Sequence, residues 1–132
     1  MADITPSQAI VLEGRVQEIV LGQAVALVGS PMEITSGLAY LAEADDTAAA
    51  ARFYGLAIET GALSATISIL LHGRVDVGAV LTQGVLYFIS ETEAKMAPQA
   101  DLTTGSNISL VGIAETTSIL NIQPWPTGIV VP

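Results

Sequence analysis

The apolar residues of this chain come in short runs, and these runs restrict the fold more than any other feature of the sequence. They are rich in Val, Ile, Leu and Thr, and Gly, Pro, Asp or Ser lies at their ends. Short β-prone runs with closely spaced turn signals predict an all-β barrel or sandwich. The segments predicted as strands are Ala9–Leu12, Val16–Val20, Ala24–Val28, Gly37–Leu41, Tyr54–Ile58, Thr66–Leu71, Arg74–Val77, Val85–Ser90, Ser109–Ala114, Ser118–Ile122 and Ile129–Val131.

A helix is expected in only one place, near residues 45–52. The stretch DDTAAAARF begins with Asp45 and Asp46, either of which can cap a helix, and alanine is the best helix former. The same two aspartates could contribute to a calcium site, but the D-x-D-x-D-G spacing of a calcium loop is absent. We therefore expect at most one short helix, with Asp45 or Asp46 as its cap.

The size of the chain predicts one β domain over residues 11–132, preceded by a short N-terminal arm over residues 1–10. Only 13% of the residues are charged, about half the usual share. Much of the surface must then consist of Ala, Thr, Ser, Gly and Gln, which lose little when they leave water. This composition favours packing against other copies or a larger assembly, with a plain monomer as the alternative.

The net charge of −9 arises from thirteen acidic residues against Arg15, Arg52, Arg74 and Lys95. So few cations cannot neutralise a phosphate backbone, so we expect no nucleic-acid partner. The sequence contains neither a basic amphipathic helix nor an apolar run of about 18 residues, so we expect no membrane partner. The N-terminus lacks the features of an export signal, and cysteine is absent, which fits synthesis in a cytoplasm.

The two halves of the chain resemble each other, which predicts an internal duplication over about 21–78 and 81–131. In order, LGQAVALV resembles LTQGVLYFI, LAEADDT resembles MAPQADLT, YGLAIET resembles VGIAETT, and ATISILLHGRVDV resembles SILNIQPWPTGIVV. Neither half would fold alone, because each would leave open strand edges. Gly55 and Gly112 mark equivalent strands in this alignment and are expected to permit a bulge or close packing.

His72 is the single histidine and the first candidate for catalysis. A triad with Ser68 or Ser64 and Asp76 can be drawn, but Ser68 and His72 share one predicted strand and no G-x-S-x-G elbow is present. One histidine cannot seed a zinc site, and no nucleotide-binding glycine motif occurs. We interpret His72 as a turn or interface residue and expect no catalytic residue, metal or cofactor.

Glu91 and Glu93, followed by Lys95, form a second candidate. Alternation along a strand would place both glutamates on one face, as a carboxylate pair in a hydrolase requires. The segment SETEAK nevertheless follows a predicted strand and is the most polar part of the chain. A solvated hairpin tip, whose charges discourage aggregation after VLYFI, is the better interpretation.

Both ends of the chain carry apolar residues that are candidates for contacts with other subunits or proteins. Ile4, Thr5 and Pro6 lie in a short, nearly uncharged segment that could add a strand to a neighbouring protein, with a frayed terminus as the alternative. Near the other end, Trp125 stands between Pro124 and Pro126.

The two prolines predict a stiff, irregular crossing there, because proline donates no ladder hydrogen bond. Trp125 could stack on a glycan, but covering a core or packing on a partner is the more usual role for such a residue. We predict that Pro124, Trp125 and Pro126 form a contact with another subunit or with a partner protein.

Taken together, the segments LTQGVLYFIS, KMAPQADLTTG, ISLVGIA and LNI follow one another in a pattern that resembles the capsid decoration, or cement, proteins of tailed bacteriophages. Similar β modules occur in phage head-fibre proteins. The upstream segments GQAVALV, AEADDTAAAARFYGLA and GRVDVG fit the same order, so the resemblance covers roughly residues 21–131. SETEAK stands where a shorter S-x-x-x-G-K-like turn is expected, which leaves the contacts of this loop open.

The resemblance implies a β-rich structural protein without catalysis that binds the outside of a major capsid protein shell and stabilises the mature head. It further implies a homo-oligomer, often a trimer, made in the host cytoplasm and located on the outer surface of the virion. One alternative is a receptor- or glycan-binding module of a virion fibre or tail, which would expose several aromatic residues along a groove. Another is a small hydrolase that uses Glu91 and Glu93, or His72.

Overall fold

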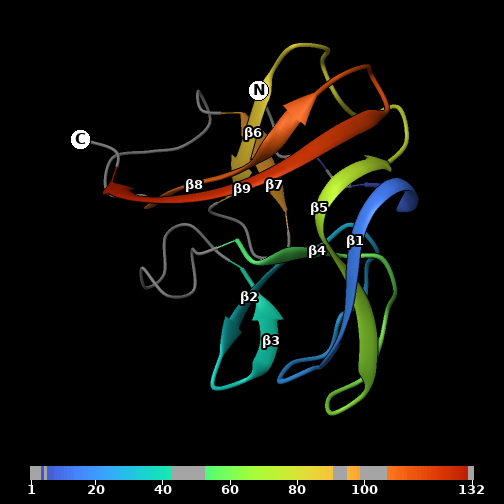
Figure 1. Ribbon diagram of the computed structural model, residues 1–132, viewed down its shortest axis with the longest axis vertical. Helices are drawn as coiled ribbons and strands as arrows, with labels where there is room; N and C mark the ends of the chain where they lie inside the picture. Colours follow the sequence, from blue (N-terminus) through green and yellow to red (C-terminus); the bar gives the residue numbers. More distant parts are fainter. Residues whose placement is uncertain (1–3, 5, 43–52, 91–94, 99–106, 131–132) are drawn as a thin grey trace.

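The computed structural model describes residues 4, 6–42, 53–90, 95–98 and 107–130, with the backbone alone for 107–108 and 124–130. Within these residues the chain forms nine strands and no helix, which confirms the all-β prediction (Figure 1). The helix expected near 45–52, with Asp45 and Asp46, lies outside the described residues. The strands are β1 (Ile10–Val20), β2 (Pro31–Thr35), β3 (Leu38–Leu41), β4 (Gly55–Ala57), β5 (Thr66–Asp76), β6 (Leu86–Ile89), β7 (Met96–Pro98), β8 (Asn107–Ala114) and β9 (Ile119–Val130).

The long strand β5 joins the whole sheet because both of its edges are paired. β1 runs antiparallel along one edge for the full length of β5. The other edge is shared, since β4 pairs with it at Ile69 and Leu70 and β9 pairs with it between Gly73 and Asp76. β5 therefore belongs to two groups of strands, β3-β2-β4 in the lower half of Figure 1 and β9-β8-β6-β7 in the upper half.

The sheet curls so far in its lower half that β3 approaches the end of β1. Leu21, directly after β1, forms a parallel bridge with Ala39 in β3, and the Gly22 amide donates a hydrogen bond to the Ala39 carbonyl oxygen at 2.9 Å. The ring of Tyr40 lies against Gly22, at a place that any larger residue would fill. The sheet is thus a curled, antiparallel half-barrel, in agreement with the predicted small barrel.

Two buried clusters lie on opposite faces of β4 and β5. Leu56 and Leu70 belong to the larger cluster, while their neighbours along the chain, Ala57 and Ile69, belong to the smaller one. Successive side chains of a strand point to opposite faces, so neighbouring residues are buried on both sides of the same pair of strands. The sheet therefore separates the two cores and is covered on both faces at this point.

A bulge in β5 keeps its apolar residues on the correct faces. The pairing of β1 with β5 passes from Arg15 opposite His72 to Val16 opposite Leu70, so Leu71 is an extra residue. An extra residue shifts the alternation of side chains by one. Regular alternation would place Leu70 and Val75 on opposite faces of β5. Because of the bulge, both contribute to the same core.

Gly14 of β1 and Gly73 of β5 lie directly opposite each other between the irregularities of this pairing. Their φ angles are +137° and +129°, a region that residues with a Cβ rarely adopt. A Cβ at Gly73 would overlap the Glu13 carbonyl oxygen, and one at Gly14 would overlap the His72 carbonyl oxygen. Glycine at both positions lets the two strands stay paired while they bend toward the upper group.

These two glycines explain the main difference between the predicted and observed strands. The predicted segments Ala9–Leu12 and Val16–Val20 are one strand, β1, and Thr66–Leu71 joins Arg74–Val77 to form β5. Gly14 and Gly73 were interpreted as strand ends, but each lies inside a strand and pairs with the other. The prediction of separate strands was wrong because Gly14 and Gly73 pair with each other.

Other strand predictions failed for simpler reasons. Ala24–Val28 is not a strand; only Val25 forms an isolated bridge there, to Gly61. The short strands β2 and β7 were missed because each contains a proline, at Pro31 and Pro98. Both prolines lie at a strand end, where the missing ladder donor is tolerated.

The segment 124–126 continues β9, which corrects the predicted irregular crossing between strands. Trp125 lies opposite Leu110 of β8, and Pro126 lies opposite Ser109. The register shifts on both sides of this segment. Irregular pairing leaves out some ladder hydrogen bonds, and for this reason a strand can accommodate two prolines here.

The same strand pairings occur in both halves of the chain. β2 pairs with β3 and β4, and β4 pairs with β5. In the same order, β6 pairs with β7 and β8, and β8 pairs with β9. Gly55 and Gly112 occupy β4 and β8, where a Cβ would press on a carbonyl oxygen of the following long strand. A duplication would produce this order, and it stays our interpretation of the two halves.

A buried carboxyl group lies in the β2–β3 pair. Glu33 is 4% exposed, and its carboxylate accepts a hydrogen bond of 2.7 Å from the Thr35 hydroxyl. Burial raises the pKa of Glu33 above its ordinary value of 4.5, because the charged form loses hydration, and the Thr35 hydrogen bond opposes part of this rise. The Glu59 carboxylate is the opposite case, since hydrogen bonds from Ser68 lower its pKa.

Replacing Gly73 with alanine should destabilise the fold by at least about 2 kcal/mol, because the residue would be strained at positive φ and would overlap β1. Gly84→Ala is the matched control, since Gly84 also has a positive φ but has no atom near its Cβ position. We expect the control to lose about 1 kcal/mol from backbone strain alone. Urea unfolding measures both; equal losses would show that the close approach of β1 and β5 is unimportant.

Glu33→Gln should remove a pH dependence of the free energy of unfolding. A raised folded-state pKa contributes stability below the unfolded value of 4.5, and this is lost as the pH rises through the folded value. Relative to the wild type, the glutamine variant should therefore gain stability as the pH rises above 4.5. Glu59→Gln should show the opposite slope, because its pKa is lowered. Denaturant unfolding between acidic and neutral pH tests both, and parallel wild-type and Glu33→Gln profiles would contradict the assignment.

Candidate interaction surface

The most prominent apolar surface of the described chain follows β1. Ile10, Leu12, Val16 and Val20 are exposed by 54%, 49%, 44% and 41%. Large aliphatic side chains in one strand of a soluble protein are usually buried, and a group of them at the surface marks a place where another molecule binds. β1 is therefore the part of the described chain where a binding surface is best sought.

The backbone of β1 is also available on one side. Among the described residues, β1 pairs only with β5, so its second edge has no strand beside it along most of its length. Unpaired N–H and C=O groups at a sheet edge can accept a further strand. β3 and β7, at the ends of the sheet order, are much shorter, and the residue Ile4 already forms a bridge to Met96 of β7.

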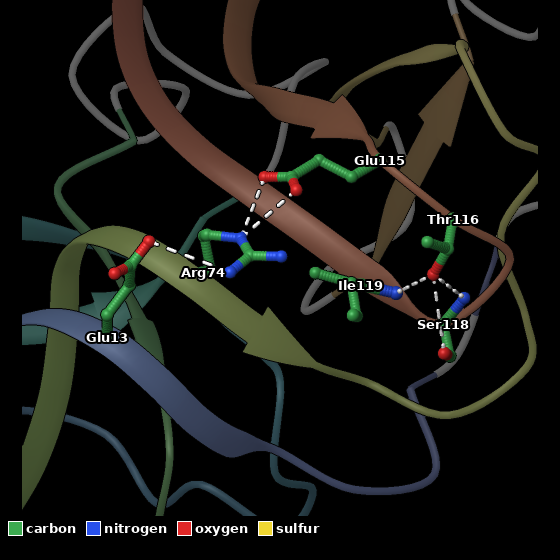
Figure 2. A network of polar contacts seen from close by, with 6 residues as sticks. All are labelled: Glu13, Arg74, Glu115, Thr116, Ser118 and Ile119. Carbon is green, nitrogen blue, oxygen red and sulfur yellow. Dashed lines mark hydrogen bonds and ion pairs between the residues drawn. The ribbon is translucent and has the colours of Figure 1, made fainter.

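Of the charged residues of β1, Glu13 contacts a charged side chain of another described strand, whereas Arg15 does not. Figure 2 shows the Arg74 side chain of β5 between two carboxylates, with Nε 3.0 and 3.1 Å from the two oxygens of Glu115 and Nη1 3.7 Å from Glu13. These contacts join β1, β5 and the turn after β8. Arg15 is exposed, lies opposite His72, and makes no ion pair with another described residue.

The turn that carries Glu115 is held by its own hydrogen bonds. The Thr116 hydroxyl oxygen accepts hydrogen bonds from the Ser118 amide at 3.2 Å and the Ile119 amide at 3.0 Å (Figure 2). A hydroxyl that closes such a turn restricts the backbone locally. Glu115 is therefore placed over Arg74 by a fixed turn, and β1 is held from the side opposite its free edge.

The N-terminal residues of the predicted contact arm lie against the chain's own fold. Ile4 is buried in the larger core and its amide donates to the Met96 carbonyl oxygen at 2.9 Å. Pro6 is buried against Gly29. Thr5 lies outside the described residues. The side chains of Ile4 and Pro6 therefore offer little surface to a partner in this conformation, and their role in a capsid or subunit contact stays a prediction.

The C-terminal contact residues are placed by the backbone alone. Pro124, Trp125 and Pro126 lie in the half of β9 that extends beyond β5. Their side chains are outside the described part of the structure. The subunit or capsid contact at this position stays a prediction.

The residues considered for catalysis are not brought together. His72 is exposed in the middle of the paired part of β5, and Ser68 lies on the same strand. Asp76 is occupied by hydrogen bonds from the Gln8 side chain at 2.8 Å and the Gly78 amide at 2.9 Å. Ser64 belongs to the loop before β5, while Glu91 and Glu93 lie outside the described residues.

The described residues contain no group of three or more histidines and carboxylates that could hold a metal ion. Of the aromatic side chains that the structure describes, Phe53, Tyr87 and Phe88 are buried, Tyr40 is half-buried and Tyr54 is exposed. The described part of the chain contains no helix that is long and apolar enough to cross a membrane.

Comparison of the chain with protein-family models, with curated proteins and with solved structures finds no match.

The β1 surface was not identified from the sequence. Its residues had been assigned to two predicted strands with ordinary apolar patterns, which resemble core strands. One feature of the sequence could have indicated that these two segments pair. The tripeptide Gly-Arg-Val occurs at 14–16 and again at 73–75. The two copies lie across from each other in β1 and β5, with Gly14 opposite Gly73.

Ile4→Ala should lower the free energy of unfolding by about 2 kcal/mol, because it removes a core side chain that also anchors the N-terminal segment. Ile10→Ala makes the same chemical change at an exposed site of β1 and should alter stability by less than about 0.5 kcal/mol. Chemical denaturation of both variants tests this. An Ile4→Ala variant as stable as Ile10→Ala would indicate that residues 1–9 form a free arm.

Proposed function

We propose that this protein is a capsid decoration protein of a tailed bacteriophage, which binds the outer surface of the major capsid protein shell as a homo-oligomer and stabilises the mature head. It performs no catalysis in this role. The observation that carries the proposal is a chain with very few charged residues that exposes an aliphatic strand, β1, which suits the self-association of a homo-oligomer. The resemblance of its β segments to decoration proteins supplies the class of partner.

The surface of the chain suits binding to a large assembly. Burying aliphatic surface stabilises a complex by about 25 cal/mol per Å² of area removed from water. Lysine and glutamate side chains must give up hydration and rotational freedom when they are buried, and this chain has few of them for its size. A weak contact per copy is sufficient, because the shell presents the same site many times.

Such a protein stabilises a shell by mass action. If it binds the expanded state of the shell and not the unexpanded one, each bound copy lowers the free energy of the expanded state. The shell then resists the internal pressure of packaged DNA without any change in its own sequence. A protein in this role needs a rigid fold and a defined contact surface, and it needs no reactive group.

The purified chain should co-sediment with expanded shells of its phage, saturate at a fixed number of copies per shell, and raise the temperature at which the shells rupture. Unexpanded shells are the control and should bind it poorly. Electron microscopy of saturated shells should show regular additional density on the outer surface. Absence of binding to expanded shells at saturating concentrations would reject the proposed function.

A further inference from the structure

We propose that β1 is the strand through which copies of this chain associate, with β1 of one copy lying along β1 of another and Arg15 of each facing Glu13 of its neighbour. This inference deepens the self-association part of the proposed function and rests on that part alone. It does not depend on which surface meets the shell.

The first argument is the combination of an open edge and an exposed apolar face in one strand. β1 is 11 residues long, and among the described strands it is the longest whose second edge is unpaired. It exposes four large aliphatic side chains, at positions 10, 12, 16 and 20. An uncovered strand of this length and character would aggregate unless a specific partner covered it.

The second argument is charge, which selects a second copy as that partner. A net charge of −9 makes copies of the chain repel each other over most of their surface. β1 is different, because Arg15 lies exposed between Glu13 and Glu18 and makes no ion pair with another described residue. β1 therefore carries both a cation and carboxylates that can receive one, since Glu13 keeps 66% of its side chain exposed although it lies 3.7 Å from Arg74. In this sense β1 is complementary to itself.

The simplest arrangement shows this complementarity directly. In an antiparallel pairing of two β1 strands centred on Gly14, Glu13 of each copy lies opposite Arg15 of the other. Leu12 of each copy is brought beside Val16 of the other. Opposite charges facing each other across strands, next to paired aliphatic residues, are the contacts that stabilise a sheet.

The position of β1 in the fold leaves this contact accessible. Its other edge is paired along its full length with β5, and on that side Glu13 lies 3.7 Å from Arg74, which also contacts Glu115 (Figure 2). The strand is thus rigid before a second copy arrives, which reduces the entropy lost on association.

The test is the mass of the full-length chain in solution, measured by light scattering and sedimentation across a dilution series. A pairing of β1 with itself closes at two copies, so the wild type should form a dimer. Val16→Glu and Leu12→Glu should each weaken association by at least about tenfold, because they bury an unpaired charge between the strands. Leu86→Glu is the matched control, since Leu86 is similarly exposed but lies in β6, and it should leave the mass unchanged.

Charge exchange makes the test specific for β1. Arg15→Glu and Glu13→Arg should each weaken association, because like charges then face each other. The double variant with both changes should recover it, with circular dichroism confirming that each variant is folded. An oligomer that Val16→Glu and Leu12→Glu leave intact, or a double variant that stays dissociated, would overturn the proposal.

Binding to shells is measured in parallel and separates the two proposals. A wild type that is monomeric in solution and still saturates expanded shells would overturn the β1 inference and the self-association part of the proposed function, but would leave binding to the shell standing. If the wild type is an oligomer that the β1 substitutions dissociate, but it does not bind expanded shells, the β1 inference stands and the proposed function is rejected.

Discussion

The structure depends on the pairing of β5 along both of its edges. One edge is covered by β1, and the other carries β4 and then β9 within the same strand. No other described strand connects the lower and upper groups in this way. Its alternation places Ile69 and Leu70 in different cores, and its bulge at Leu71 brings Val75 back to the face of Leu70. The glycine pair at 14 and 73 is what allows this strand to bend without losing its neighbour.

The fold class was predictable because the short length of the apolar runs, their β-prone composition and the turn residues between them all indicated strands. The strand boundaries were less so, and the errors have a common cause. A glycine between two apolar runs predicts a turn when only local sequence is considered. At Gly14 and Gly73 each glycine is instead required by the backbone of the other strand, which lies far away in the chain. No local pattern contains that information.

The candidate surface was harder to predict than the fold for a related reason. Ile10, Leu12 and Val16 have the composition of a core strand, and only the observed packing shows that no described element covers them. Conversely, Ile4 and Pro6 looked like part of a free arm because they are close to the terminus, but both are buried against the β domain. Exposure depends on the whole arrangement of strands, so it cannot be derived from sequence position at either site.

The low charge and the acidic balance of the chain act in opposite directions. A surface with few charged side chains associates easily, while nine net negative charges hold copies apart wherever their surfaces are not matched. A protein that must occupy specific sites on a repeating lattice benefits from both properties, because unspecific clustering would compete with binding. Repulsion then suppresses most encounters, and attraction is confined to the segment where an arginine interrupts the acidic surface. In this chain that segment is β1, where Arg15 stands between Glu13 and Glu18 beside exposed aliphatic residues.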